Sequence, residues 1–183
     1  MKNAALLVID IQRGAFDGER CAPIDRPETF VENALQLIGA ARGSGTPVVF
    51  VKHCDSAGEV FEEGSPHWEL HESLVPQTGD KVLKKYASSA FEGTDLATAL
   101  EEVHVKELVL CGLQSEFCVS NTANSALAMG FAVFVAQDAH RTWPSKTEPA
   151  FAISERVNQE LKARGASLAP TAALAQSLRE PRT

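Results

Sequence analysis

Short apolar runs alternate with amphipathic segments along nearly the whole chain, and this alternation constrains the fold more than any other feature. A continuously apolar run, such as residues 4–9, is typical of a strand buried on both faces of a parallel sheet. Between such runs, apolar residues recur at helical spacing. We therefore expect an α/β fold: a single-domain three-layer α/β/α sandwich over residues 1–183, with a central, mostly parallel sheet of about six strands.

The boundaries of these elements follow from prolines, glycines and polar residues. We predict strands at 4–9, 47–51, from 82, at 107–111, 131–136 and 167–169. We predict helices at 27–43, 149–165 and 171–178. Two more helices are expected, one that begins after Thr94 and another that follows the fourth strand and ends at Met129. The connection from Ser56 to Gly79 is long, and connections of this length are usually functional loops or carry a short helix.

Charge and composition exclude several classes of protein. With 17 basic and 24 acidic residues, the net charge is −7, which opposes nucleic-acid binding. No apolar run approaches the roughly 20 residues of a membrane helix. The first residues lack the pattern of a signal peptide, so we expect a cytoplasmic protein. The 4 cysteines show no CxxC spacing and are expected to be free thiols.

Polar residues stand where the predicted strands end. Parallel sheets bind ligands at the carboxyl ends of their strands, so Asp10, Lys84 or Lys85, and Cys118 should meet at one edge. Cys118 lies near the start of a predicted helix, where the helix dipole favours a thiolate. Lowering a thiol pKa from about 8.5 to about 6.5 requires roughly 2.7 kcal/mol. Each residue also has a structural interpretation, as a buried thiol, a turn residue or a solvated lysine, and spacing alone leaves both open.

Six segments together resemble the isochorismatase-like cysteine hydrolases, which include nicotinamidases, ureidoacrylate-type amidohydrolases and N-carbamoylsarcosine amidase. They are LLVIDIQ (6–12), PVVFVKH (47–53), GSPHWELH (64–71), DKVLKKYASSAFEGTDL (80–96), LVLCGLQSEFCVSNTANSALAMGF (108–131) and VAQDAH (135–140). They occur in the family's order and span nearly the whole chain. The motif LLVIDIQ alone would be weak, but the joint match is specific.

The resemblance implies a catalytic triad of Asp10 as acid/base, Lys85 as the cation and Cys118 as nucleophile. Lys84 is the alternative lysine. It also implies a cis peptide bond between Leu113 and Gln114, with the backbone N–H groups of Gln114 and Cys118 forming an oxyanion hole. The implied activity is hydrolysis of a C–N bond (amide, ureide or carbamoyl) in a small molecule through a thioester.

Two other functions remain open for the same fold: a non-catalytic binding or scaffold protein, and an enzyme that cleaves a vinyl ether. The sequence lacks GxGxxG after its first strand, any GxxxxGK[ST] and any GxSxG. These absences disfavour nucleotide-binding redox proteins and serine hydrolases of the lipase type.

We expect no metal and no cofactor. Nicotinamidases carry Asp-x-His after the second strand, whereas this chain has the reverse order, His53-Cys54-Asp55. His67 and His71 are 4 residues apart, as metal ligands can be, but no third ligand is near in sequence, so we predict two loop histidines. The resemblance further implies a homodimer or homotetramer. Residues predicted to face the substrate are Gln12, Phe16, His53, Phe117, His140 and Trp143.

Overall fold

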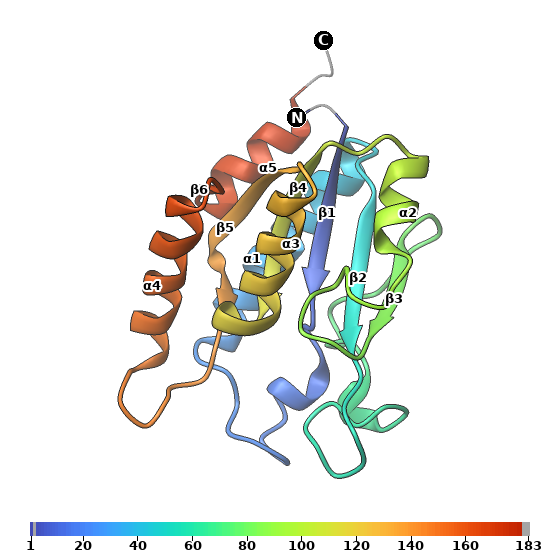
Figure 1. Cartoon of the computed structure of the whole chain (residues 1–183). Helices are drawn as coiled ribbons and strands as arrows, with labels where there is room; N and C mark the ends of the chain where they lie inside the picture. The colour runs from blue at the N-terminus through green and yellow to red at the C-terminus, as the bar shows by residue number, and fades with distance from the viewer. Residues whose placement is uncertain (2, 181–183) are drawn as a thin grey trace.

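A computed structural model, which describes residues 1 and 3–180, shows a six-stranded sheet with every strand pairing parallel (Figure 1). The strand order is β3-β2-β1-β4-β5-β6. The strands are β1 (Ala4–Ile9), β2 (Val48–His53), β3 (Lys81–Lys85), β4 (Glu107–Leu113), β5 (Ala132–Arg141) and β6 (Ser167–Ala169).

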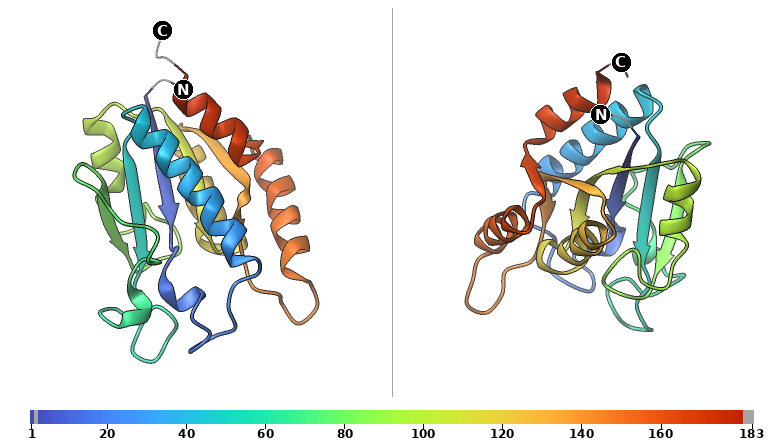
Figure 2. Two further views of the ribbon diagram at one scale, coloured as in Figure 1. Left: turned by 180° about the vertical axis from the view of Figure 1, so that it is seen from behind. Right: turned by 45° about the horizontal axis from the view of Figure 1, so that its top comes forward.

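Helices cover both faces of this sheet, which completes the predicted three-layer α/β/α sandwich. The helices α1 (Pro27–Gly43) and α5 (Thr171–Arg179) lie together on one face (Figure 2, left). The other face carries α2 (Leu96–Glu102), α3 (Ser120–Ala128) and α4 (Ala150–Ala163).

The strand β1 explains why the sheet has a core on each side. All 6 of its residues are buried, and successive side chains of a strand point to opposite faces. Leu6 and Val8 pack in the core beneath α1, whereas Leu7 and Ile9 pack in the core beneath α2 and α3. The unbroken apolar sequence of β1 is therefore the consequence of two cores rather than one.

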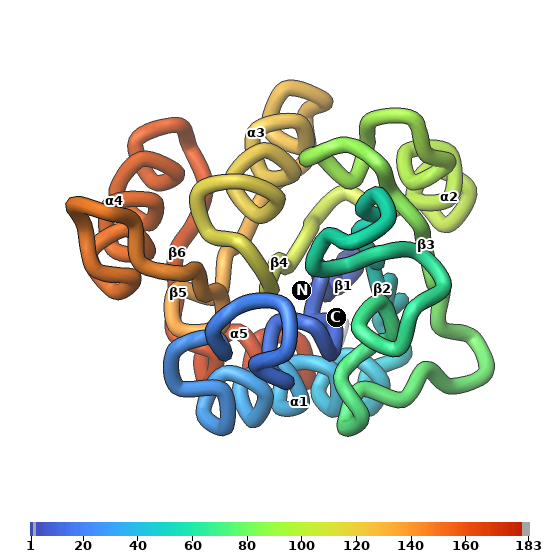
Figure 3. Tube along the Cα trace, turned by 90° about the horizontal axis from the view of Figure 1, so that it is seen from below, coloured from blue at the N-terminus to red at the C-terminus, as the bar shows by residue number. Residues whose placement is uncertain are grey.

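The strand order places a topological switch point beside β1. The chain runs outward from β1 through β2 and β3, and then returns to β4 on the other side of β1. Such a reversal opens a crevice at the carboxyl ends of the two central strands. Seen from that end, the loops after β1 and β2 crowd around the start of α3 (Figure 3). Two short 3₁₀ helices, Arg13–Ala15 and Pro66–Trp68, lie in these loops.

The close contact between β4 and β1 depends on one glycine. Gly112 has φ of 136°, and a Cβ there would lie 2.0 Å from the carbonyl oxygen of Ile9. Only glycine can adopt this conformation at such a short distance. The two strands therefore approach closely where the crevice opens.

Two of the differences from the prediction affect the region where the crevice opens. The strand β5 continues to Arg141 instead of ending at residue 136, because an irregularity in its pairing with β4 lets it resume with Gly112 opposite His140. After β4, a π-helical turn (Ser115–Val119), here called the nucleophile turn, precedes α3. Within the described residues, no helix combines the length and apolar character needed to cross a bilayer.

Candidate active site

A buried ion pair lies at the carboxyl ends of β1 and β3. Asp10 follows β1 with φ of 53° and is 2% exposed, and Lys85 ends β3 and is fully buried. The Lys85 Nζ atom lies 2.8 Å from Asp10 Oδ2. Two charges so far from water are tolerated only when they are paired, so each side chain favours the ionised form of the other.

Lys85 also contacts three further groups, which makes its ammonium the centre of the site. The Nζ atom lies 3.1 Å from Cys118 Sγ, 2.8 Å from His53 Nδ1 and 3.2 Å from the Ala87 carbonyl oxygen. The neighbouring Lys84 instead pairs with Glu63 at 2.8 Å on the surface. The structure therefore brings Lys85, not Lys84, to Asp10 and Cys118.

Cys118 sits in the nucleophile turn, between the end of β4 and the first residue of α3. Besides Lys85, its sulfur lies 3.9 Å from Ser88 Oγ. The peptide bond between Leu113 and Gln114, at the other end of this turn, is cis. Gln114 and Cys118 both line one pocket.

The protonation of the site differs from the expectation drawn from sequence. Burial, together with the negative charge of Asp10, raises the pKa of Cys118 to about 11, although Lys85 opposes this. Burial also raises the pKa of Asp10, again opposed by Lys85. The prediction of a lowered Cys118 pKa was wrong because it counted the helix end and a lysine but not burial or the carboxylate. One ammonium can offset only one of the two negative charges that Asp10 and Cys118 could carry.

The pocket above Cys118 has a volume of about 350 Å³, and its wall includes the aromatic rings of Phe61, Phe117 and Trp143. It is lined by Asp10, His53, Asp55, Val60, Phe61, Ser88, Gln114, Phe117, Cys118 and Trp143. Four of these residues, Asp55, Val60, Phe61 and Ser88, were not singled out from the sequence. Asp55 and Ser88 carried a usable signal, because each closely follows a strand at the ligand-binding edge. Val60 and Phe61 lie within the long connection and carried none.

His53 and Asp55 form a pair beside Lys85. Because the Lys85 ammonium can only donate, His53 Nδ1 accepts, and His53 Nε2 carries the proton. His53 Nε2 lies 3.0 Å from Asp55 Oδ1 and donates to it. In this chain the order His53-Cys54-Asp55 therefore places a hydrogen-bonded histidine–aspartate pair beside Lys85.

Gln12, predicted to contact substrate, is completely buried and holds the loops instead. Its Oε1 accepts from the His53 backbone N–H at 2.7 Å, and its Nε2 donates to the carbonyl oxygens of His53 and Trp68 at 3.0 and 2.8 Å. This side chain ties the end of β2 to the following connection.

The remaining predicted substrate contacts divide into two groups. Phe117 and Trp143 line the pocket, and the Trp143 indole donates to the Ala22 carbonyl oxygen at 2.6 Å. Phe16 lies on the wall of a different cavity and packs against the His71 ring. His140 is fully buried, so its predicted contact with substrate is wrong: the strand that it was expected to follow continues through it.

Among the described residues, one group has the composition of a metal site, namely Asp10, His53 and Cys118. One ligand atom from each residue lies within 4.8 Å of the others. The Lys85 ammonium contacts all three side chains, so the positive charge among these donors comes from the protein itself. His67 and His71 have separate partners: His67 pairs with Asp17 at 2.7 Å, and His71 packs on Phe16.

Comparisons with known proteins identify the family of this chain. A family model described as Isochorismatase domain matches residues 4–169. An uncharacterised isochorismatase family protein of Bacillus subtilis, YddQ, is 35% identical over 84% of this chain and 86% of its own length. Streptothricin hydrolase of Streptomyces noursei is 33% identical over 90% of this chain, which spans 58% of that longer protein. Maleamate amidohydrolase of Pseudomonas putida is 31% identical over 75% of this chain and 71% of its own length.

A solved structure agrees at the level of the backbone. The crystal structure of an isochorismatase from Pseudomonas putida has a TM-score of 0.86 and 30% identity, and the match covers 93% of this chain and 89% of that one. The family model covers most of the chain, and the likeness includes the strands that carry Asp10, Lys85 and the nucleophile turn. The chain therefore belongs to the isochorismatase family of hydrolases.

Proposed function

We propose that this protein hydrolyses a C–N bond of an amide, ureide or carbamoyl group in a small molecule, with Cys118 as nucleophile. The observation that carries the proposal is the ammonium of Lys85, which lies 2.8 Å from the Asp10 carboxylate and 3.1 Å from the Cys118 sulfur, two groups that line a pocket. Nucleophile, base and cation in mutual contact are the parts that acyl transfer through a thioester requires. The relative named maleamate amidohydrolase supports the same class of reaction.

We assign the resting proton to the Cys118 thiol and the negative charge to Asp10, and this assignment sets the first step. The Asp10 carboxylate takes the thiol proton while the Cys118 sulfur attacks the carbonyl carbon, and a tetrahedral intermediate forms. Lys85 stays charged and stabilises the negative charge as it moves from carboxylate to substrate. The thiol is neutral before attack, so Asp10 acts as base in the same step that forms the C–S bond.

The second half of the reaction returns the proton and consumes water. Protonated Asp10 donates to the leaving nitrogen, the C–N bond breaks, and a thioester remains on Cys118. Asp10 then takes a proton from water, the hydroxide adds to the thioester carbon, and the C–S bond breaks as the sulfur regains a proton. The backbone N–H groups of Gln114 and Cys118 are the proposed oxyanion donors, since both residues line the pocket.

A panel of primary amides, ureides and N-carbamoyl compounds tests the proposal, with ammonia release as the readout. The expected result is turnover by the wild type and by Cys21→Ser, which removes the other half-exposed thiol, and none by Cys118→Ala. Mass spectrometry of quenched reactions should find the acyl group on Cys118. Turnover that survives in Cys118→Ala would overturn the mechanism, and cleavage of a vinyl ether with no amide turned over would favour the alternative activity.

Assembly into a homodimer or homotetramer stays a prediction from the sequence. Size-exclusion chromatography with light scattering would measure it directly. A monomer in that experiment would contradict it.

A further inference from the structure

Behind the pocket, a chain of three hydrogen bonds, two of them buried and the third partly buried, joins α4 to the nucleophile turn. Ser115 Oγ lies 2.8 Å from His140 Nδ1 and 3.0 Å from Ser154 Oγ, and His140 Nε2 lies 2.9 Å from Asn158 Oδ1. Ser154 and Asn158 come from α4, and His140 comes from β5. We call Ser154, Ser115, His140 and Asn158 the buried relay.

The donor and acceptor of each hydrogen bond in the buried relay follow from the second partner of Asn158 and from the neutral ring of His140. Asn158 Nδ2 donates to the Gln137 carbonyl oxygen at 3.3 Å, which leaves Asn158 Oδ1 as the acceptor for His140 Nε2–H. Burial lowers the pKa of His140 to about 4, so the ring is neutral and its Nδ1 has a lone pair. Ser115 therefore donates to His140 and accepts from Ser154.

A serine, a histidine and an asparagine in contact resemble a nucleophilic triad, but this one cannot reach a substrate. Ser115 and His140 are both 0% exposed, and neither lines the pocket. The chain of hydrogen bonds instead ends on the first residue of the nucleophile turn. That residue follows Gln114 directly and precedes Cys118 by three positions, between the two proposed oxyanion donors.

We propose that Ser115, His140 and Asn158 are positioning residues that fix the backbone of the nucleophile turn so that the N–H groups of Gln114 and Cys118 meet the developing oxyanion. This inference rests on the proposed function. A neutral histidine in a single tautomer offers one acceptor in one direction, which sets the orientation of Ser115 more narrowly than packing alone. A small displacement of catalytic groups has a large effect on rate, so the buried relay governs turnover from outside the pocket.

Two reagents separate positioning from nucleophilicity. Iodoacetamide alkylates a thiol by displacing iodide and needs no oxyanion hole. 4-Nitrophenyl acetate reacts at its carbonyl carbon: the Cys118 sulfur adds, 4-nitrophenolate leaves, and an acetyl thioester forms through an oxyanion. A fault confined to the oxyanion donors therefore slows acylation and leaves alkylation unchanged.

The experiment compares Ser115→Ala and Asn158→Leu, which break the buried relay at different points, with the wild type. The control Thr171→Val removes an equally buried hydroxyl that donates to Asp138, on the same strand as His140 but away from the pocket. Cys118→Ala gives the background for both reagents. We expect acylation of Cys118 to fall at least tenfold in both relay variants, with alkylation within about threefold of wild type and Thr171→Val unchanged.

Three results would overturn the inference, and they have different meanings. Acylation unchanged in folded relay variants means that the buried relay has no positioning role. Equal losses of acylation and alkylation mean that it merely supports the fold around Cys118. Absence of Cys118-dependent nitrophenolate release from the wild type overturns the proposed function itself. If one relay variant does not fold, as judged by circular dichroism, the other decides the outcome.

Discussion

Replacing Asp10 by asparagine should change two properties of Cys118 in opposite directions. The carboxylate raises the pKa of Cys118, and it is also the proposed base. Asp10→Asn removes the charge and the base together while nearly keeping the shape of the side chain. The thiol should therefore become more reactive towards an alkylating agent, whereas the enzyme should lose turnover.

The structure gives the size of the effect on the thiol. The ligand atoms of Asp10 and Cys118 lie within 4.8 Å. Two unit charges at that distance interact by about 3.5 kcal/mol at an effective dielectric constant of about 20. Because about 1.36 kcal/mol corresponds to one pKa unit, the pKa of Cys118 should fall from about 11 to roughly 8.5.

Iodoacetamide alkylation from pH 6 to 11 measures this change, with the adduct located by mass spectrometry. At pH 8 the thiolate fraction should rise by about two orders of magnitude, but a thiolate of lower pKa is a weaker nucleophile, with a Brønsted coefficient of about 0.4–0.5. The net expectation is an acceleration of about 20-fold at pH 8. Turnover of amides should fall by about 100-fold or more.

An alkylation rate that is unchanged or lower in Asp10→Asn would refute this reasoning. It would mean that the resting proton sits on Asp10 and that Cys118 is already a thiolate, so that the substitution removes no charge. Circular dichroism must first show that the variant is folded. Lys85 keeps His53, the Ala87 carbonyl oxygen and Cys118 as partners.

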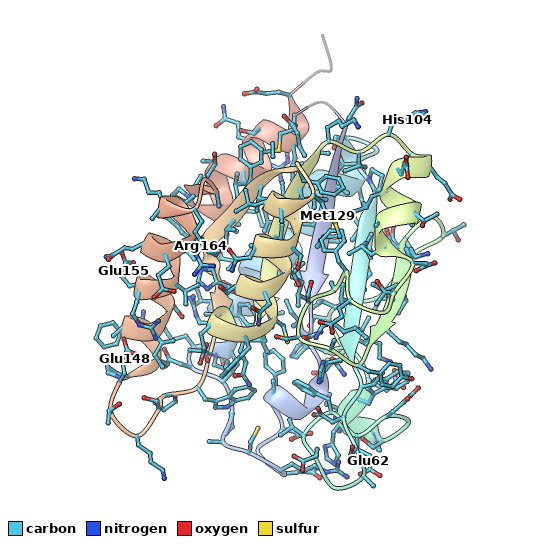
Figure 4. All side chains as sticks on the ribbon, viewed as in Figure 1. Glu62, His104, Met129, Glu148, Glu155 and Arg164 are labelled. Carbon is cyan, nitrogen blue, oxygen red and sulfur yellow. The ribbon has the colours of Figure 1, made fainter. Side chains whose placement is uncertain are left out.

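Three further predictions concern stability and can be measured by urea unfolding. Lys85→Met should lower the free energy of unfolding by about 3 kcal/mol at pH 7, because it leaves the Asp10 carboxylate buried and unpaired. Adding Asp10→Asn to the same chain should restore most of the loss. A double variant that is no more stable than Lys85→Met would contradict this. Because the pKa of His140 is lowered to about 4 in the folded chain, only the unfolded chain binds a proton at this histidine between about pH 4 and pH 6.5. About 3 kcal/mol of stability should therefore be present above pH 6.5 and lost as the pH falls towards 4. That loss should be absent in His140→Gln and kept in the control His104→Asn, whose side chain is exposed at the opposite end of the molecule from Glu62 (Figure 4). Gly112→Ala should lower the free energy of unfolding by about 3 kcal/mol or more, since its Cβ would lie 2.0 Å from the Ile9 carbonyl oxygen. Gly39→Ala, in α1, should not lower it in this way, because a Cβ there would meet no neighbouring atom within 4 Å. Equal effects of the two substitutions would refute the steric argument.

The site illustrates where reading a sequence succeeds and where it stops. Asp10 and Cys118 follow strands that the pattern of apolar residues locates, so their meeting at one edge follows from parallel pairing. The choice between Lys84 and Lys85 does not follow from such a pattern. In β3, Leu83 and Lys85 are buried while Lys84 is exposed, and a strand with one buried leucine and three lysines does not reveal which face is inside.

Histidine at position 140 shows a second limit. The strand was predicted to end at residue 136, which placed His140 just after a strand end and led to the prediction that it faces substrate. The strand instead resumes after an irregularity in its pairing with β4, and His140 turns inward to Ser115 and Asn158. Its partners are 25 and 18 residues away in sequence, and no local pattern connects them.

The sequence by itself determined the layer architecture, because the apolar periodicity of each segment reports how many of its faces are buried. It also located the aspartate, lysine and cysteine motifs that carry the family resemblance. Only the tertiary structure decided the protonation of the site and the direction of the buried side chains. Those properties depend on burial and on charges brought together from distant segments: Asp10, Lys85 and Cys118 come from three separate parts of the chain, and their pKa values arise only where these parts meet.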